Sequence, residues 1–372
     1  MKVICGKDEL MKGLQIVSPV ASSKNTLPVL SNILFETNTD KIKLSSTDLE
    51  TAVQCYIKGE IVEEGAITIP AKRFADIIKE LSSDQTIEIT ADDTNQINVI
   101  SGKSRFNLMG ISQKEYPIIP EFPKDNNIII KKDILTTMIK KTIFAVSKDA
   151  QRYILNGIYV IIERNNLKMV STDGRRLAYI EDNIQTNIKG KAIVPFKAMA
   201  DILRLLISEV NSETIKLGLT NNQIALDMDG ITFLSTLIEG AFPSYEQVIP
   251  KTNESKAKLN VKNTLAAVKQ MALLTADKVS SDRSAAVKFY FSSNNLKISV
   301  STAGVGSGEV ELEIKYTGEP TEINFNPNFI KDVLQNIDEE FAILEFKNAL
   351  NPTKISPENA KNYLCVVMPM RI

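Results

Sequence analysis

Apolar residues recur in this chain with the spacing of one helix face in three separate places. In each place they stand at positions i, i+3, i+4 and i+7, which fall on one side of an α-helix. The three stripes consist of Phe74, Ile77, Ile78 and Leu81, of Met199, Ile202, Leu203 and Leu206, and of Ile330, Val333, Leu334 and Ile337. This pattern predicts three amphipathic helices, each with its stripe packed on a core.

The segments around these stripes also repeat. Residues 65–72 (GAITIPAK) resemble residues 190–197 (GKAIVPFK), and Pro70 and Pro195 stand 125 positions apart. Further helix-like stretches open near the start of each copy, at Lys7, Lys132 and Lys262. Self-similarity over about a third of the chain is too long for a solenoid repeat and indicates three whole domains.

Segments typical of strands fill most of the remaining chain. Three related runs cover 41–48, 167–173 and 296–302, and alternating apolar and polar positions cover 86–90 and 214–219. Proline-bearing joints follow at 116–123 and 242–250. Two helices among many strands, without strict strand–helix alternation, predict the α+β class. We expect three similar domains, each with two helices packed on antiparallel sheets, over residues 1–125, 126–253 and 254–372.

The composition excludes several kinds of chemistry. The chain has no histidine, which removes catalytic triads, histidine metal sites and histidine acid–base catalysis. Cys5, Cys55 and Cys365 are far apart and form no CxxC pair, so we expect buried thiols, no metal site and no cofactor. An enzyme based on carboxylates or lysines would need a convergent cluster that the sequence does not show.

The charge balance and the apolar runs bear on the class of partner. The 44 Lys and Arg nearly cancel the 45 Asp and Glu, so contact with nucleic acid requires segregated charge. No apolar run approaches the ~18 residues of a membrane span. The start of the chain lacks the apolar core of a signal peptide, so we expect a cytoplasmic protein with no membrane partner.

Cations recur on the polar faces of the predicted helices. Lys72 and Lys79 lie opposite the first stripe, and Lys197 and Arg204 hold the same places 125 positions later. The third helix has Asn328 and Gln335 there, and Lys140, Lys141, Lys148 and Lys278 add to the first helices of the second and third copies. Such faces are typical of solvated helices, but aligned cations also suit a surface that follows phosphates without reading sequence. A scaffold that binds only proteins would not depend on them.

Six short motifs stand in one order along the chain. They are residues 26–30 (TLPVL), 46–50 (STDLE), 101–106 (SGKSRF), 152–157 (RYILNG), 172–178 (TDGRRLA) and 366–372 (VVMPMRI). Together with the threefold repeat, they resemble the beta sliding clamps of bacterial DNA polymerase III. The resemblance covers essentially the whole chain.

The resemblance implies a processivity factor and not an enzyme. Its fold would be the DNA clamp fold, with two subunits joined head to tail in a six-domain ring whose helices line the hole. Such a ring encircles duplex DNA independently of sequence and slides along it. Its implied partners are double-stranded DNA, a second copy of the chain, the catalytic subunit of the replicative polymerase, the clamp loader and other proteins with a clamp-binding motif.

The resemblance also implies roles for individual residues. The positions that would face DNA are Lys24, Arg73, Lys148, Arg152, Tyr153, Lys197 and Arg204. The dimer interface would contain Lys103, Arg105, Phe106 and Leu108 on one side and Leu273, Leu274, Glu309, Glu311 and Glu313 on the other. Alternating glutamates are also typical of an ordinary solvated strand, so the apolar members matter more.

A hydrophobic pocket for partner peptides is the third implied site. Its residues would be Leu155, Thr172, Gly174, Arg176, Leu177, Pro243, Val248, Val367, Met368, Pro369, Met370 and Arg371. An apolar C-terminal end is often only a last strand, but methionine-rich surfaces adapt to varied partners. Arg175 and Gln247 stand where many members have other polar residues, which affects the rim of the pocket more than its floor.

Overall fold

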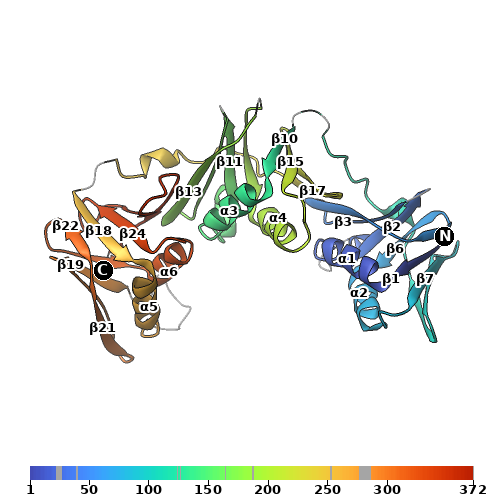
Figure 1. Cartoon of the computed structure of the whole chain (residues 1–372), viewed down its shortest axis with the longest axis horizontal. Helices are drawn as coiled ribbons and strands as arrows, with labels where there is room; N and C mark the ends of the chain where they lie inside the picture. Colours follow the sequence, from blue (N-terminus) through green and yellow to red (C-terminus); the bar gives the residue numbers. More distant parts are fainter. Residues whose placement is uncertain are drawn as a thin grey trace. The chain divides into compact units, whose positions relative to one another are not determined.

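The computed structural model of the chain describes residues 1–21, 27–38, 41–123, 125, 127–163, 165–186, 188–251, 254–275 and 286–371. The protein forms two compact units, Met1–Thr136 with Lys197–Leu237 and Thr137–Phe196 with Ile238–Ile372. Figure 1 shows sheets flanked by short helices in each of them. The strands pair antiparallel and the helices do not alternate strictly with them, so the predicted α+β class is confirmed.

The first unit contains a five-stranded sheet of order β5-β1-β7-β8-β9 and an eight-stranded sheet of order β10-β15-β16-β17-β4-β3-β2-β6. Its strands are β1 (Lys2–Gly6), β2 (Asn32–Asn38), β3 (Lys41–Thr47), β4 (Thr51–Ile57), β5 (Glu60–Glu63), β6 (Gly65–Pro70), β7 (Thr86–Ala91), β8 (Gln96–Ser101), β9 (Ser104–Met109), β10 (Asn127–Lys131), β15 (Thr214–Leu219), β16 (Gln223–Met228) and β17 (Ile231–Thr236). Its helices are α1 (Lys7–Val17), α2 (Ala71–Glu80), all but the first residue of α4 (Phe196–Ser208), and the short 3-10 turns η1 (Pro28–Ser31) and η2 (Gln113–Glu115).

The second unit contains a nine-stranded sheet of order β14-β11-β12-β13-β26-β25-β24-β18-β22 and a four-stranded sheet of order β21-β20-β19-β23. Its strands are β11 (Gly157–Glu163), β12 (Asn166–Thr172), β13 (Arg176–Asn183), β14 (Gly190–Pro195), β18 (Ser255–Asn260), β19 (Val287–Ser292), β20 (Asn295–Thr302), β21 (Gly306–Glu313), β22 (Lys315–Thr317), β23 (Thr321–Phe325), β24 (Phe341–Phe346), β25 (Thr353–Pro357) and β26 (Tyr363–Val367). Its helices are most of α3 (Lys132–Ile143), α5 (Val261–Ala272), α6 (Pro327–Gln335), and the turns η3 (Ala150–Leu155) and η4 (Tyr245–Gln247).

One order of elements occurs three times along the chain. Each copy has a strand, a helix, four strands, a second helix and three strands, with β5 and β22 as extra short strands in the first and third copies. The three-domain organisation predicted from the repeat is therefore confirmed. In Figure 1, α1 and α2 lie together in the first unit, as α5 and α6 do in the second.

The predicted apolar stripes fix the second helix of each copy on its sheet. The buried members of these stripes are Phe74, Ile78, Leu81, Met199, Ile202, Leu206, Ile330, Val333, Leu334 and Ile337. The start of α6 is also fixed by local chemistry. The side chain of Asn326 accepts the N–H of Asn328, and Pro327 occupies a first-turn position where no intrahelical N–H is needed.

Strands also pair across the limits between copies. At what we call the first joint, β17 pairs with β4 and Leu234 stands opposite Ala52. At the second joint, β26 pairs with β13 and Val366 stands opposite Leu177. Because the middle copy pairs with a neighbour at both joints, its strands are divided between the two compact units.

A turn of identical construction stands beside each joint. In the first, the carboxylate of Asp48 accepts the N–H groups of Glu50 and Thr51, at 3.1 and 2.7 Å. In the second, Asp173 accepts the N–H groups of Arg175 and Arg176 at 2.9 and 3.0 Å, in an equivalent place 125 positions later. The internal repeat thus extends to individual hydrogen bonds.

Candidate functional site

A small apolar hollow lies at the second joint and has a volume of about 160 Å³. It is lined by Leu155, Thr172, Gly174, Arg175, Arg176, Leu177, Pro243, Ser244, Tyr245, Val248, Val366 and Met368. We call it the second-joint hollow. Strands β12, β13 and β26, the end of η3 and the segment around η4 supply these residues.

The floor of this hollow is part of a packed core. Leu177, Tyr245 and Val366 are buried in one cluster. Aromatic rings support the floor from below, since Tyr179 stacks on Tyr245 with ring centroids 5.9 Å apart. A buried, largely apolar floor of this kind suits the burial of an apolar anchor from a ligand.

The rim is formed by the turn between β12 and β13. Gly174 lies there at φ 84°, in the left-handed region that glycine adopts without strain. Its N–H donates to Oγ1 of Thr172 at 3.0 Å. The N–H of Met368 donates to the carbonyl of Arg175 at 2.9 Å, which holds the chain end against the same rim.

Arg176 was predicted to stand at the edge of the pocket, and the structure shows what holds it there. Its guanidinium donates to Asp173 at 3.0 Å, to Asp332 at 2.7 Å and to the carbonyl of Phe144 at 2.7 Å. It also lies over the ring of Phe329, 4.7 Å from the centroid. Only 11% of its side chain is exposed. Arg176 therefore ties the rim to α6 and to the end of α3 by multiple contacts.

Four of the predicted pocket residues do not line the hollow: Val367, Pro369, Met370 and Arg371. Successive side chains of a strand point to opposite faces. Val366 faces the hollow, so Val367 is buried on the other side of β26. Beyond the strand, Met370 donates its N–H to the carbonyl of Asn324 at 2.7 Å, and Arg371 is exposed.

The sequence reasoning missed Ser244, Tyr245 and Val366 as lining residues. A signal for two of them was available, because both directly follow Pro243 in the predicted joint. For Val366 no such signal was available. Which side chains of β26 face the hollow depends on the register between β13 and β26, in which Leu177 stands opposite Val366.

The cations predicted to face DNA differ in their surroundings. Lys197 pairs with Asp48 of the first-joint turn. Arg204 donates to the carbonyl of Gln15 in α1 at 3.2 Å and lies 3.7 Å from Asp201. Burial raises the pKa of the Asp201 carboxyl, and Arg204 and Lys197 oppose that rise. The polar face of this helix therefore has an acidic neighbour that its own sequence does not show, because the first copy supplies Asp48.

Three of the remaining residues predicted to face DNA are exposed to solvent, and a fourth is bonded near the second-joint hollow. Arg73, Lys148 and Tyr153 are exposed. Arg152 donates to the carbonyl of Asp173 at 2.9 Å, so it lies close to the rim of the second-joint hollow. Lys24 lies outside the described residues, as does Lys278.

Lys141 does not point into solvent as the helical wheel suggested. Its ammonium pairs with Asp338 at 3.1 Å and lies over the ring of Tyr363, 4.9 Å from the centroid. The helical wheel correctly places Lys141 away from the apolar stripe of its helix. In the second unit, however, residues of the third copy pack against that side of the helix.

Most of the predicted interface residues stand on or next to two edge strands, β9 and β21, and the other two follow α5. Lys103, Arg105 and Phe106 are exposed at β9, whereas Leu108 is buried in the core of the first unit. On β21, Glu309, Glu311 and Glu313 are exposed. Leu273, just after α5, exposes 82% of its surface, and Leu274 is half-buried with its carbonyl accepting from Thr302.

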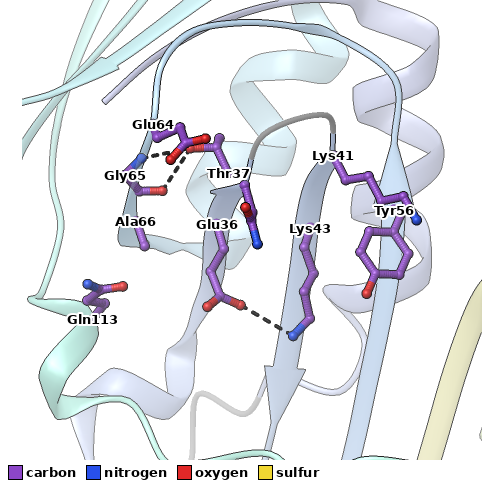
Figure 2. Close-up of a pocket in the computed structure, with 10 residues that line it drawn as sticks. Glu36, Thr37, Lys41, Lys43, Tyr56, Glu64, Gly65, Ala66 and Gln113 are labelled. Carbon is purple, nitrogen blue, oxygen red and sulfur yellow. Dashed lines mark hydrogen bonds and ion pairs between the residues drawn. The ribbon is translucent and has the colours of Figure 1, made fainter.

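A larger hollow of about 640 Å³ lies on the first unit and is polar (Figure 2). In its wall, Glu36 of β2 pairs with Lys43 of the neighbouring strand β3 at 3.5 Å, and Lys41 lies over the ring of Tyr56. Within the described ranges, no group of three His, Cys, Asp or Glu side chains could hold a metal ion. No helix in the same residues is long and apolar enough to cross a membrane.

Three domain families match the chain in order. They are the N-terminal, central and C-terminal domains of the DNA polymerase III beta subunit, over residues 1–120, 129–244 and 246–371. The chain belongs to the DNA polymerase III beta subunit family. Its function is that of this family: a sliding clamp that serves as the processivity factor of the replicative DNA polymerase and is not itself catalytic.

Relatives of known name agree over the full length. The chain is 32% identical to the beta sliding clamp of Chlamydia muridarum (100% of this chain, 99% of the relative) and 31% identical to that of Haemophilus influenzae (100% of each). Among solved structures, it resembles a putative DNA polymerase III beta subunit from Eubacterium rectale with a TM-score of 0.94 at 27% identity. It also resembles the sliding clamp of Bartonella birtlesii bound to griselimycin, with a TM-score of 0.94 at 29% identity; both matches cover 100% of each chain.

Replacing Arg176 in this clamp by methionine should lower the free energy of unfolding by about 3 kcal/mol. The cost arises because Asp173 and Asp332 lose their shared, largely buried partner. Lysine at this position should recover little of it, since an ammonium cannot form the planar fork. Urea unfolding measures the change, with Arg73→Met as the exposed control, which should change stability by about 0.5 kcal/mol or less. Equal losses for Arg176→Met and for the control would contradict the assigned role.

Proposed function

We propose that two chains close head to tail into a ring, that its helices face duplex DNA, and that partner proteins insert a peptide at the second-joint hollow. The observation that carries the proposal is the pairing of strands at the two joints. We place the domain limits at residues 1–125, 126–253 and 254–372, so that each joint falls between two domains.

The joints follow one rule. The last strand of the second copy, β17, pairs with β4 of the first, and the last strand of the third, β26, pairs with β13 of the second. By their places in the repeat, β4 and β13 correspond to β21, and β17 and β26 correspond to β9. The strands left over are thus β9 and β21, both at sheet edges. Pairing β9 of one chain with β21 of another extends the rule, and two such contacts close a ring.

The side chains on these two strands support that pairing. Lys103 and Arg105 are basic, whereas β21 carries three glutamates in alternation. Exposed ion pairs contribute little affinity but select the partner and its orientation. Phe106 and Leu273 add exposed apolar surface that burial would stabilise.

Leu273→Asp should convert the dimer to a monomer, because a buried unpaired carboxylate costs several kcal/mol and a head-to-tail ring contains the contact twice. The exposed Leu350→Asp serves as control and should remain dimeric. Sedimentation equilibrium at micromolar concentration gives the mass of both. A wild-type protein that is monomeric under these conditions would refute the ring.

DNA contact in this proposal comes from cations spread over the two units. Arg73 and Lys148 are exposed and make no ion pair within the described residues. Lys197 and Arg204 would have to exchange Asp48 and the carbonyl of Gln15 for phosphates. Arg152, Tyr153 and Lys24 complete the proposed set. Because phosphate contacts are screened by ions, weak individual contacts would allow the ring to slide.

Arg73→Gln combined with Lys148→Gln should weaken DNA binding and flatten its dependence on salt. Each lost phosphate contact should reduce the slope of log K against log salt by about 0.9. Fluorescence anisotropy on a labelled linear duplex over a salt series gives the slope. Lys58→Gln with Lys114→Gln removes the same charge from exposed positions outside the α-helices and should leave the slope unchanged. Equal slopes for both double variants would contradict the assignment.

The second-joint hollow would take a peptide of the polymerase catalytic subunit, the clamp loader or another partner with a clamp-binding motif. Its apolar floor of Leu177, Tyr245 and Val366 suits a leucine or phenylalanine anchor. Met368 at the rim is partly exposed and unbranched, so it can adapt to different anchors. Arg175 is exposed at the rim, whereas the guanidinium of Arg176 is shared by Asp173 and Asp332 and holds the rim in place.

Val248→Glu should weaken binding of a labelled peptide from the polymerase tail by at least tenfold, since it places a charge at the apolar edge of the hollow. Val248 is 45% exposed, so the variant should fold. Val62→Glu makes the same change at an exposed position of β5 and should bind like the wild type. Titration by fluorescence anisotropy distinguishes them, and equal affinities would remove the site from this hollow.

A further inference from the structure

A second hollow of about 150 Å³ lies at the first joint, within the first unit. Its walls come from equivalent positions of the repeat: Thr47, Ala52, Pro117 and Leu234 stand where the second-joint hollow has Thr172, Leu177, Pro243 and Val366. We call it the first-joint hollow. Its volume is close to that of its counterpart.

The backbone at this hollow is held by the same contacts as at the second. The N–H of Leu49 donates to Oγ1 of Thr47 at 3.0 Å, as Gly174 does to Thr172. The N–H of Thr236 donates to the carbonyl of Glu50 at 2.8 Å, as Met368 does to Arg175. The chain therefore presents the same groove twice.

The side chains at the edge of the first-joint hollow are more apolar than their counterparts. Leu49 is 56% exposed at φ 78°, where its counterpart is glycine. A leucine at positive φ is strained, and an exposed one gains nothing from the core in return. Ile118, in the place of Ser244, is 97% exposed. Apolar surface held in strain beside a hollow indicates a binding surface.

The charge at the edge is reversed. Glu50 takes the place of Arg175, and Thr51 takes the place of Arg176. Glu50 is exposed, and its carboxylate forms no ion pair with any described residue. The first-joint hollow therefore has the exposed carboxylate of Glu50 at its rim where the second has the exposed guanidinium of Arg175.

We propose that the first-joint hollow binds a second class of partner peptide, a short extended segment with a leucine or isoleucine anchor next to a lysine or arginine. The anchor would enter between Leu49 and Ile118 onto Ala52 and Leu234, and the cation would face Glu50. The acidic rim selects this occupant over the peptides suited to the second-joint hollow. The proposal rests on the geometry of the first joint and does not require peptide binding at the second.

The test uses the full-length protein and two fluorescein-labelled hexapeptides, Ser-Arg-Leu-Pro-Leu-Gly and Ser-Glu-Leu-Pro-Leu-Gly. The arginine peptide should bind the wild type at least tenfold more tightly than the glutamate peptide. Glu50→Arg should reverse this preference, and Ile118→Ser should weaken both. Both variants change exposed side chains, and circular dichroism verifies that they fold.

Val248→Glu separates this site from the second-joint hollow, since it should leave binding of the arginine peptide unchanged. Loss of that binding in Val248→Glu but not in Glu50→Arg would place the peptide at the second joint and overturn the proposal. Equal affinity of the wild type for the two peptides would also overturn it. A change of oligomeric mass in Ile118→Ser, measured by sedimentation, would make this surface a contact between copies instead.

Discussion

The structure depends on one constraint, the need to pair the backbone groups at the edges of its sheets. An edge strand exposes a row of N–H and C=O groups that another strand can extend. At the first joint β4 meets β17, and at the second β13 meets β26. These two contacts join three similar domains into continuous sheets, and the hollows form where the paired strands end. A chain of copies that pair in this way leaves one strand of each kind with an open edge, here β9 and β21.

The sequence predicted what depends on short spacings. The apolar stripes that include Phe74 and Ile330 gave the helices, because helical periodicity is local. Pairing across a joint is not local, since Thr232 lies opposite Gln54 and a shift of one residue turns every side chain to the other face. Because the register was not known from the sequence, Val367 was predicted in the hollow, whereas its neighbour Val366 lines it.

The predicted cations show a second limit of the same kind. A helical wheel gives the direction opposite to a helix's own stripe, but not which neighbour occupies that direction. Lys197 meets Asp48, and Lys141 meets Asp338, each from another copy of the repeat. The cations that form ion pairs across joints are therefore residues that the sequence pattern alone would assign to a solvent-exposed helix face. For Arg176, the resemblance to the family predicted its position at the pocket, and the structure adds the hydrogen-bond partners that hold its side chain there.

Repetition of one turn explains how a single scaffold supports different surfaces. Asp48 and Asp173 organise the backbone through the same acceptor bonds, so the residues between them and the next strand are free to vary. At the second joint, Arg176 connects that turn to Asp332 of α6, which couples the rim of the hollow to the packing of the third domain. At the first joint, Lys197 bonds to Asp48 itself. The turn beside each groove is therefore also bonded to the neighbouring domain, through Asp48 to Lys197 at the first joint and through Arg176 to Asp332 at the second.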